Sequence, residues 1–363
     1  MEQKRKRSAA AKVFRGIGIA LLVIVLLAGG FIAFLSATEY RSAETEAIRI
    51  EGNAAREPAV DEPLSVLSWN VGYAALDENA DFFMDGGKSV RAADAETVQT
   101  NLTAILAETK ALDPDVILFQ EVDVNSSRSR RVDEYETLLA ALDGYSASYA
   151  QNYKVSYVPY PMPPLGKVDS GVATFSSFAV QDATRVQLPV PFSWPIRTIN
   201  LKRCLLVSRI PVSGTDKELV LVNLHLEAYD DGEGKEAQTR MLAEFLNAEA
   251  KKGNYVIAGG DFNQTFSSVD DSAYPAYPGN WASGKIDVDS FGGGWQFLMD
   301  ESVPGCRLLN KPYAGADRDT FQYYLIDGFI VSANVSVDSI ETQDLGFAHS
   351  DHNPVLLTVT LNP

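Results

Sequence analysis

An uncharged apolar run of 21 residues, Ile17–Ala37, restricts how this chain can fold more than any other feature. A helix needs about 20 residues to cross the hydrocarbon core of a bilayer, so the run is long enough to span one. A buried core helix fits poorly, because charged sequence flanks the run densely. We therefore predict one transmembrane helix over residues 16–37 that anchors the protein in a membrane.

The charges on either side of the run predict its orientation. Seven acidic residues and three arginines follow it between Glu39 and Glu62. A basic cluster precedes it: Lys4, Arg5, Lys6, Arg7, Lys12 and Arg15. Basic flanks stay cytoplasmic, which predicts a cytoplasmic segment 1–15 and a single-pass protein of the cell membrane with its body outside the cytoplasm. A cleaved signal peptide is the alternative, although its apolar core is usually only ~7–15 residues long. The body is exported in both cases.

The exported part is strongly acidic. The whole chain has 31 basic and 48 acidic residues, and six basic residues and one acidic residue precede residue 16. The remainder holds 25 basic and 47 acidic residues, a net charge of about −22. Nonspecific binding of nucleic acid depends on neutralising phosphates with Lys and Arg, so this charge disfavours nucleic acid as a partner.

Cysteine and histidine are scarce. Cys204 and Cys306 are the only cysteines, which excludes a disulfide framework and a thiolate-rich zinc cluster. Outside the cell the two could form a single disulfide; the alternative is a buried free thiol at Cys204, which lies in an apolar stretch. Three histidines argue against a multi-histidine metal cage.

Apolar runs and helical spacing predict one mixed domain over residues 64–363, preceded by a polar linker at 38–63. The predicted helices are 89–110, 134–142 and 236–250. The predicted strands are 64–69, 116–120, 171–175, 204–209, 219–226, 255–258, 324–331 and 355–361. Strands and helices without strict alternation indicate sheets covered by helices, an α/β (α+β) fold. Residues 267–295 are predicted to form a long loop.

Polar residues follow several apolar runs at the point where each strand ends. The stretches are Ser68–Asn70, Phe119–Val122, Asn223–Glu227, Gly259–Asn263 and Ser350–Pro354, with a weaker one at Leu325–Asp327. Each residue alone is more often a turn, a cap or an interior hydrogen-bonding group. Two of the three histidines fall in these stretches, however, and converging strand ends would form one acidic pocket.

Such a pocket suits a metal. Asn70, Glu121 and Asp351 offer only hard oxygen ligands, and few protein ligands with retained water are usual for Mg²⁺. Mn²⁺ or Ca²⁺ are possible substitutes. A metal there would polarise a phosphoryl oxygen and stabilise charge on the leaving oxygen.

The remaining polar residues suit hydrolysis. His352 can act as general base on a water if Asp327 fixes its tautomer. Asp261 can orient the same water, and Asn263 and His225 can donate to phosphate oxygens. Together these residues predict metal-assisted hydrolysis of a phosphate ester.

The order Trp-Asn, Gln-Glu, Asn-Leu-His, Gly-Asp-Phe-Asn, Asp, Ser-Asp-His-x-Pro-Val resembles the endonuclease/exonuclease/phosphatase superfamily, which is typified by deoxyribonuclease I. The resemblance covers roughly residues 64–361 and implies a catalytic domain of four layers, two face-to-face mixed β-sheets flanked by helices. It implies metal-site roles for Asn70, Glu121 and Asp351. It also implies catalytic roles for His225, Asp261, Asn263, Asp327 and His352.

The substrate is less defined. Lys154, Arg197 and Arg203 are candidates to bind the substrate phosphate, and the aromatic, proline-rich stretch 157–164 could edge the cleft. Acidic charge and a membrane anchor favour a phospholipid headgroup or a small phosphoester, monoester or diester. An extracellular nuclease is the first alternative, and a noncatalytic binding module is the second. A monomer is assumed.

Overall fold

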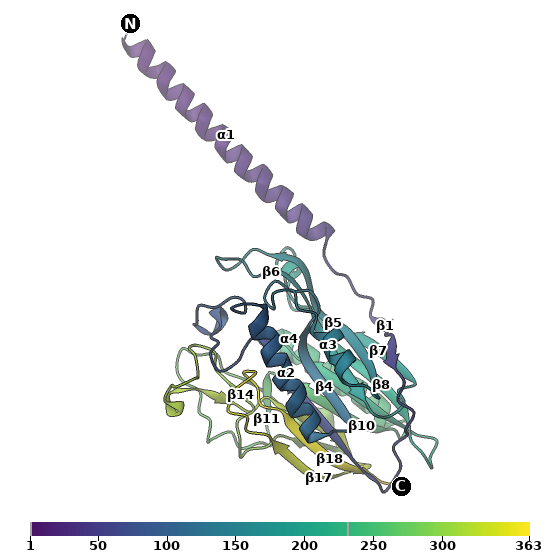
Figure 1. Cartoon of the computed structure of the whole chain (residues 1–363). Helices are drawn as coiled ribbons and strands as arrows, with labels where there is room; N and C mark the ends of the chain where they lie inside the picture. Colours follow the sequence, from purple (N-terminus) through teal and green to yellow (C-terminus); the bar gives the residue numbers. More distant parts are fainter. Residues whose placement is uncertain (1, 231) are drawn as a thin grey trace.

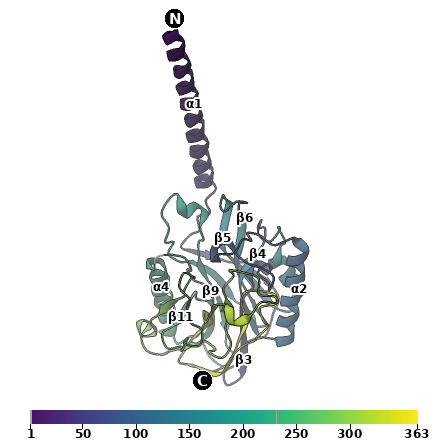
Figure 2. The same ribbon diagram turned by 90° about the vertical axis from the view of Figure 1, so that its left-hand side faces the viewer.

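The computed structural model describes residues 2–230 and 232–363, apart from the side chains of residues 2–8. The basic side chains at residues 4–7 therefore lie outside the described part. Helix α1 (Glu2–Ala37) projects away from the body of the protein (Figures 1 and 2). Within it, Ala9–Ala37 has 29 residues and a mean hydropathy of 2.9. By length and composition this stretch can cross a membrane.

Two seven-stranded mixed sheets form the body. Sheet A contains, in spatial order, β1 (Thr45–Ala47), β7 (Asp182–Gln187), β8 (Cys204–Pro211), β9 (Glu218–His225), β10 (Tyr255–Asp261), β16 (Asp327–Ser332) and β13 (Trp295–Leu298). Sheet B contains β17 (Val335–Thr342), β18 (Val355–Leu361), β3 (Pro63–Asn70), β4 (Val116–Asp123), β6 (Gly166–Ser176), β5 (Ser146–Val158) and β2 (Ile50–Gly52). Two small sheets pair β11 (Gln264–Phe266) with β12 (Gly284–Ile286) and β14 (Cys306–Arg307) with β15 (Tyr323–Tyr324).

Helices cover the outer faces of both large sheets. Helices α2 (Ala95–Leu112) and α3 (Glu134–Ala141) pack on sheet B, and α4 (Glu233–Ala250) packs on sheet A. In Figure 2, α4 and α2 lie on opposite sides of the strands. Short 3₁₀ turns complete the body: η1 (Gly72–Ala74), η2 (Phe83–Asp85), η3 (Ile196–Ile199), η4 (Val288–Phe291) and η5 (Arg318–Thr320). The predicted four-layer α/β sandwich is confirmed.

Alternation along the central strands builds this layering. In β4, Val116 and Leu118 pack between the sheets, whereas Ile117 and Phe119 pack under the helices. Successive side chains of a strand point to opposite faces, so a strand with both faces covered must be apolar throughout. The continuous apolar runs of the sequence therefore mark the centres of the sheets.

Several predicted elements have different boundaries, and two of the differences have an identifiable origin. Helix α2 begins at Ala95 rather than residue 89, because the Asp94 side chain caps it by accepting a hydrogen bond from the Thr97 amide at 2.8 Å. Val90 is buried in the preceding loop, and its spacing from the apolar residues of α2 matches that of a helix by coincidence. The predicted strand 324–331 is divided between β15 and β16, because residues 325 and 326 belong to neither strand.

Two segments that we expected to be irregular contain short elements. Residues 38–63 include β1 and β2, which pair with β7 and β5 at the edges of the two large sheets. Residues 267–295 include β12 and η4. Three-residue strands carry too little apolar pattern to be recognised in the sequence. Residues 45–52 therefore attach the predicted linker to the body.

Glu249 on α4 gives the fold a measurable pH dependence. Its Oε1 lies 2.6 Å from Nη2 of Arg209 on β8. Burial alone would raise the pKa of Glu249, but hydrogen bonds from Arg209, Lys252 and Asn254 lower it to about 2. A carboxylate whose pKa is lower in the folded state stabilises the fold above its unfolded-state pKa, and this stabilisation disappears as the pH falls.

We expect Glu249→Gln to lower the free energy of unfolding by about 1–3 kcal/mol at neutral pH. The difference from the wild type should shrink between pH ~4.5 and pH ~2, where the wild-type carboxylate takes up its proton. Urea unfolding of the detergent-solubilised protein at several pH values measures it, with Glu244→Gln, an exposed position of the same helix, as the control. A difference that does not change with pH would contradict the assignment.

Candidate active site

Strand topology brings polar residues of both large sheets to one edge of the sandwich. Strands β3 and β4 are parallel, as are β9 and β10, so their carboxyl ends share an edge. Strand β16 is antiparallel to β10, with Asp327 opposite Asp261. Strand β18 is antiparallel to β3 and begins shortly after His352. The predicted convergence of the strand-end motifs is therefore present.

Asp261 lies at the centre of this edge. Its Oδ2 accepts a hydrogen bond from Nδ2 of Asn70 at 3.0 Å and lies 3.4 Å from Nε2 of His225. The same oxygen lies 3.8 Å from Nε2 of His352. Its Oδ1 accepts a hydrogen bond from the backbone amide of Asn263 at 2.8 Å. One carboxylate thus contacts residues from three separate motifs and from both sheets.

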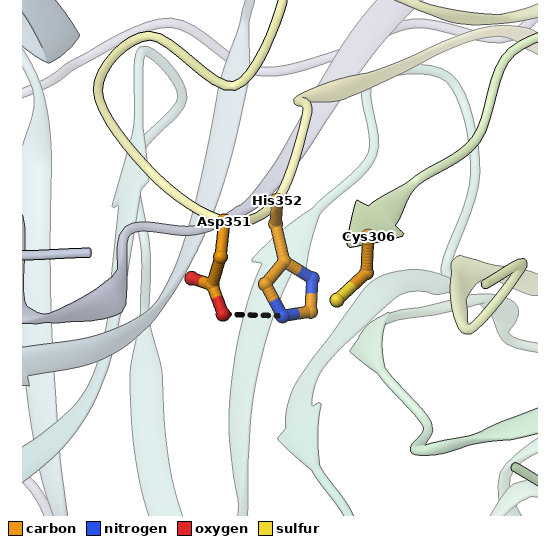
Figure 3. A group of neighbouring side chains, drawn as sticks. All are labelled: Cys306, Asp351 and His352. Atoms are coloured by element: carbon orange, nitrogen blue, oxygen red, sulfur yellow. Dashed lines mark ion pairs between the residues drawn. The ribbon is translucent and has the colours of Figure 1, made fainter. Parts of the chain in front are cut away.

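His352 forms a buried pair with Asp327, with 2.8 Å between Nδ1 and Oδ2. Burial alone would lower the pKa of His352, but Asp327 and the neighbouring acidic groups raise it well above 6.5. Figure 3 shows the ring between the Cys306 thiol and Asp351, whose Oδ2 lies 4.0 Å from Nε2. Since Asp327 occupies Nδ1, Nε2 is the nitrogen that can receive a proton from a bound molecule.

His225 has the opposite charge preference. Burial and the positive charge of Arg203 lower the pKa of His225 well below 6.5. Its Nδ1 has no hydrogen-bond partner among the described residues, and the side chain lines the pocket at this edge. The site therefore combines one neutral and one strongly basic imidazole.

Glu121 leaves sheet B at a bulge in β4. The register between β4 and β6 shifts between Phe119 and Val122. Glu121 has a φ of 56°, a left-handed conformation that non-glycine residues rarely adopt. The bulge places Oε1 of Glu121 3.4 Å from Nδ2 of Asn70, and Oε2 lies 3.1 Å from Nη1 of Arg128. Backbone strain of this kind is typical of functional sites.

The oxygen donors at this edge fit a hard divalent cation. Burial raises the pKa of Asp351 to about 6, and Glu121 contributes to the rise by repulsion, against the attraction of His352. Burial and Asp351 likewise raise the pKa of Asp85 to about 6. Burial is the larger cause of both rises because it disfavours the charged carboxylate, and a cation bound nearby would favour that charged form. Carboxylate and amide oxygens are the donor set that Mg²⁺, Mn²⁺ or Ca²⁺ binds.

The edge opens into a pocket of about 210 Å³. Several residues that line it were not predicted from the sequence: Tyr73, Asp85, Arg128, Tyr229 and Arg307. The guanidinium of Arg128 lies 3.8 Å from the centre of the Tyr73 ring and 3.0 Å from Oδ1 of Asp123. Arg128 lies in a turn of serines and arginines with no spacing that relates it to the strand-end motifs. Only the fold places it beside Glu121.

Arg203 is the one predicted substrate-binding cation that lines the pocket. Its side chain is buried and donates to the carbonyl oxygen of His225 at 3.0 Å. It also lies 3.3 Å from Oε2 of Glu227. Arg203 therefore holds the strand that carries His225.

Lys154 and Arg197 lie outside the pocket lining, contrary to our expectation. Nζ of Lys154 on β5 is 4.0 Å from Oδ2 of Asp169. Nε of Arg197 in η3 is 3.2 Å from Oε1 of Glu39, next to the end of α1. Both cations pair with largely buried carboxylates outside the pocket lining, a position that their sequence neighbours could not indicate.

Comparison with known proteins agrees with this architecture. Residues 67–352 match the sequence profile of the Endonuclease/Exonuclease/phosphatase family. A search of curated proteins found no match.

Solved structures share the fold at low sequence identity. A Beutenbergia cavernae endonuclease/exonuclease/phosphatase is 18% identical, with a TM-score of 0.53 over 83% of this chain and 72% of that one. A Leptotrichia buccalis protein of this family is 17% identical, with a TM-score of 0.53 over 82% of this chain and 100% of that one. D. rerio TDP2, complexed with a single-strand DNA product, is 16% identical, with a TM-score of 0.51 over 83% of this chain and 100% of that one.

Cys204 and Cys306 are free and buried, so the structure does not join them in the disulfide that remained an alternative. Burial raises the pKa of Cys204 to about 11 and that of Cys306 to about 12. The thiolate is the reactive form, so we expect neither residue to react with iodoacetamide at neutral pH before unfolding. Intact-mass measurement with and without urea, in the absence of reductant, checks this. Rapid alkylation of the native protein would contradict it.

Proposed function

The chain belongs to the endonuclease/exonuclease/phosphatase family, and on that premise we propose that its exported domain hydrolyses a phosphate ester with the help of a divalent metal. The arrangement of His352 carries this proposal. Its Nδ1 is paired with Asp327 at 2.8 Å, and its Nε2 lies 3.8 Å from Asp261. A histidine held in this way suits general-base catalysis on a water.

The carboxylates around His352 raise its pKa, and a divalent cation held by Glu121 and Asp351 would offset part of this effect, so that Nε2 is free to accept a proton. In the proposed reaction, Asp261 orients a water and Nε2 of His352 takes its proton. The water oxygen forms a bond to phosphorus while the ester P–O bond breaks and the alcohol oxygen leaves. Asp327 remains on Nδ1 and stabilises the imidazolium that forms.

His225 and Asn263 face the phosphoryl group in this proposal. The low pKa of His225 keeps its ring neutral, so it binds a phosphate oxygen through a hydrogen bond rather than as a cation. The Asn263 amide group donates to the carbonyl oxygen of Leu226 at 2.9 Å, which fixes its orientation at the pocket. Donors that are already fixed need no reorganisation as charge develops.

Glu121 and Asp351, with Asn70 beside them, would hold the metal. When bound, Mg²⁺ polarises a phosphoryl oxygen and stabilises the charge on the leaving oxygen. Arg128 binds Oε2 of Glu121 at 3.1 Å and so fixes the orientation of that carboxylate.

The substrate that we favour is a phospholipid headgroup or a small phosphoester, reached by a domain that α1 tethers to the cell membrane. The acidic charge of the exported part supports this choice, because an extended nucleic acid would be repelled. The basic residues that precede the apolar stretch of α1 support a cytoplasmic N-terminus.

We expect the full-length protein, solubilised in detergent, to hydrolyse at least one phosphoester in the presence of Mg²⁺ and to stop when EDTA is added. A panel of bis-p-nitrophenyl phosphate, sphingomyelin, phosphoinositides, plasmid DNA and RNA measures this. His352→Ala should lower the rate by about 10²–10⁴-fold, the usual contribution of a general base.

His349→Ala is the matched control, because His349 is the one histidine outside the site. It should retain the wild-type rate. Activity that survives in His352→Ala or in EDTA would contradict the mechanism. Strong metal-dependent cleavage of DNA without cleavage of any lipid would contradict our substrate preference.

Metal binding can be tested apart from turnover. Glu121→Gln removes one negative charge from the donor set, so we expect it to weaken Mn²⁺ binding at least about tenfold. Isothermal titration calorimetry measures the affinity, with Glu341→Gln on the exposed face of β17 as the control. Equal affinities in the wild type and in Glu121→Gln would exclude Glu121 as a ligand.

A further inference from the structure

Exposed apolar side chains gather on two loops next to the end of α1. The first loop, residues 157–165, comprises the last two residues of β5 and the turn that follows them, and the second, residues 191–201, includes η3. We call the exposed members the apolar patch: Tyr157 (37% exposed), Tyr160 (66%), Met162 (86%), Trp194 (56%) and Ile196 (53%). Single exposed apolar residues are ordinary, but a group of them in one place marks an interaction surface.

The patch touches the apolar part of α1. The rings of Phe31 and Tyr157 meet edge to face, with centroids 6.1 Å apart. The indole Nε1 of Trp194 donates to Oγ of Ser36 at 2.9 Å. Both α1 residues lie within Ala9–Ala37, the stretch that is long enough to span a bilayer. If that stretch lies in a membrane, the patch lies at the membrane surface.

Ion pairs just beyond α1 support this placement. Glu39 lies 3.2 Å from Nε of Arg197 and 3.4 Å from Nζ of Lys202, so the second loop is held against the segment that leaves the helix. Arg91 donates to the carbonyl oxygen of Pro164 and holds the first loop from the other side. The patch is therefore fixed to the anchor rather than carried on a free loop.

The same two loops line the catalytic pocket. Leu165 from the first loop and Phe192 and Leu201 from the second are pocket residues. The Tyr160 ring packs edge to face against Phe83, another pocket residue, with centroids 5.7 Å apart. Both loops therefore extend from the end of α1 to the lining of the pocket.

We infer that the apolar patch inserts into the surface of the bilayer that α1 crosses, and that it presents the pocket to phosphoesters in lipid headgroups. This inference rests on the membrane tether of the proposed function and narrows its substrate to membrane lipids. The bilayer is the occupant because Phe31 and Ser36, which the patch contacts, belong to the spanning stretch.

The composition of the patch fits this occupant. Trp and Tyr rings are amphipathic and concentrate at the level of the headgroups, with the polar atom towards water. Apolar side chains of interfacial segments reach ~5–10 Å into the boundary between headgroups and acyl chains. Tyr160, Met162 and Trp194 would lose exposed apolar area there, which stabilises the docked arrangement.

Fluorescence quenching in proteoliposomes tests the docking directly. Full-length Met162→Cys and Ile196→Cys variants are labelled with the environment-sensitive dye NBD, which the buried native cysteines should not take up. The vesicles contain phosphatidylcholine and phosphatidylglycerol, with part of the phosphatidylcholine carrying a doxyl quencher on its acyl chain. Ser336→Cys is the control, on the exposed end of β17 near the C-terminus and away from α1 (Figure 1).

We expect both patch labels to lose roughly half of their emission or more, as suits a depth of ~5–10 Å, and the Ser336→Cys label to keep its emission. Absent quenching at the patch, equal quenching at all three positions, or failure of the protein to float with the vesicles would overturn the inference. The measurement needs no turnover, so its result is independent of whether the proposed chemistry is correct.

Activity provides the second arm. The double variant Met162→Asp/Ile196→Asp places two charges in the patch but none in the pocket lining. Hydrolysis of a lipid in vesicles should fall at least about tenfold, because charged side chains are costly at an apolar membrane boundary. Hydrolysis of soluble bis-p-nitrophenyl phosphate should stay at the wild-type rate. An equal fall for both substrates, or no fall for the lipid, would overturn the inference.

Discussion

Asn223 reaches across the sandwich from β9 in sheet A and donates its amide to the carbonyl oxygens of Phe119 and Ala173 in sheet B, at 3.1 and 2.9 Å. Gln120 on β4 donates back to Oδ1 of Asn223 at 2.9 Å. Buried amides of this kind are costly unless every partner is in place, so they allow one alignment of the two sheets. His225, two residues after Asn223, and Glu121, the residue after Gln120, then lie at the same edge. The rest of the site depends on this alignment.

Carboxylates and cations are buried together at that edge. Glu121, Asp351 and Asp261 share it with Arg128, Arg203 and Arg307, and burial raises the pKa of Asp261 to about 7. Arg128 offsets part of the negative charge of Glu121, and the surrounding fold keeps the carboxylates close together. Burying charged groups together in this way costs stability, and perturbed pKa values of this kind are typical of functional sites. The two histidines differ in their pKa, because Asp327 raises the pKa of His352 whereas burial lowers the pKa of His225.

The connection between α1 and the body is short and closely tied. Strands β1 and β2 attach residues 45–52 to the edges of the two large sheets, and Glu39 pairs with cations of the η3 loop. A flexible linker would leave the body free to rotate relative to α1. Here one face of the domain is fixed next to α1. Strands β1 and β2, the ion pairs of Glu39 and the contact of Trp194 with Ser36 hold it there. Loops of that face also line the pocket, so the same contacts fix the position of α1 relative to the pocket.

The sequence by itself determined the apolar helix that is long enough to span a membrane, the central strands and the motif residues of the site. The apolar run depends only on its length, β4 is apolar because both of its faces are covered, and His352 and Asp261 belong to local motifs at strand ends. Only the tertiary structure decided which charged side chains pair with residues far away in the sequence. Arg128 meets Glu121 through a turn, whereas Lys154 and Arg197 pair with carboxylates outside the pocket. The physical reason is the distance along the chain over which each feature is determined. Apolar periodicity is a local property of the chain, whereas the partner of a charged side chain depends on which distant segments the fold brings together.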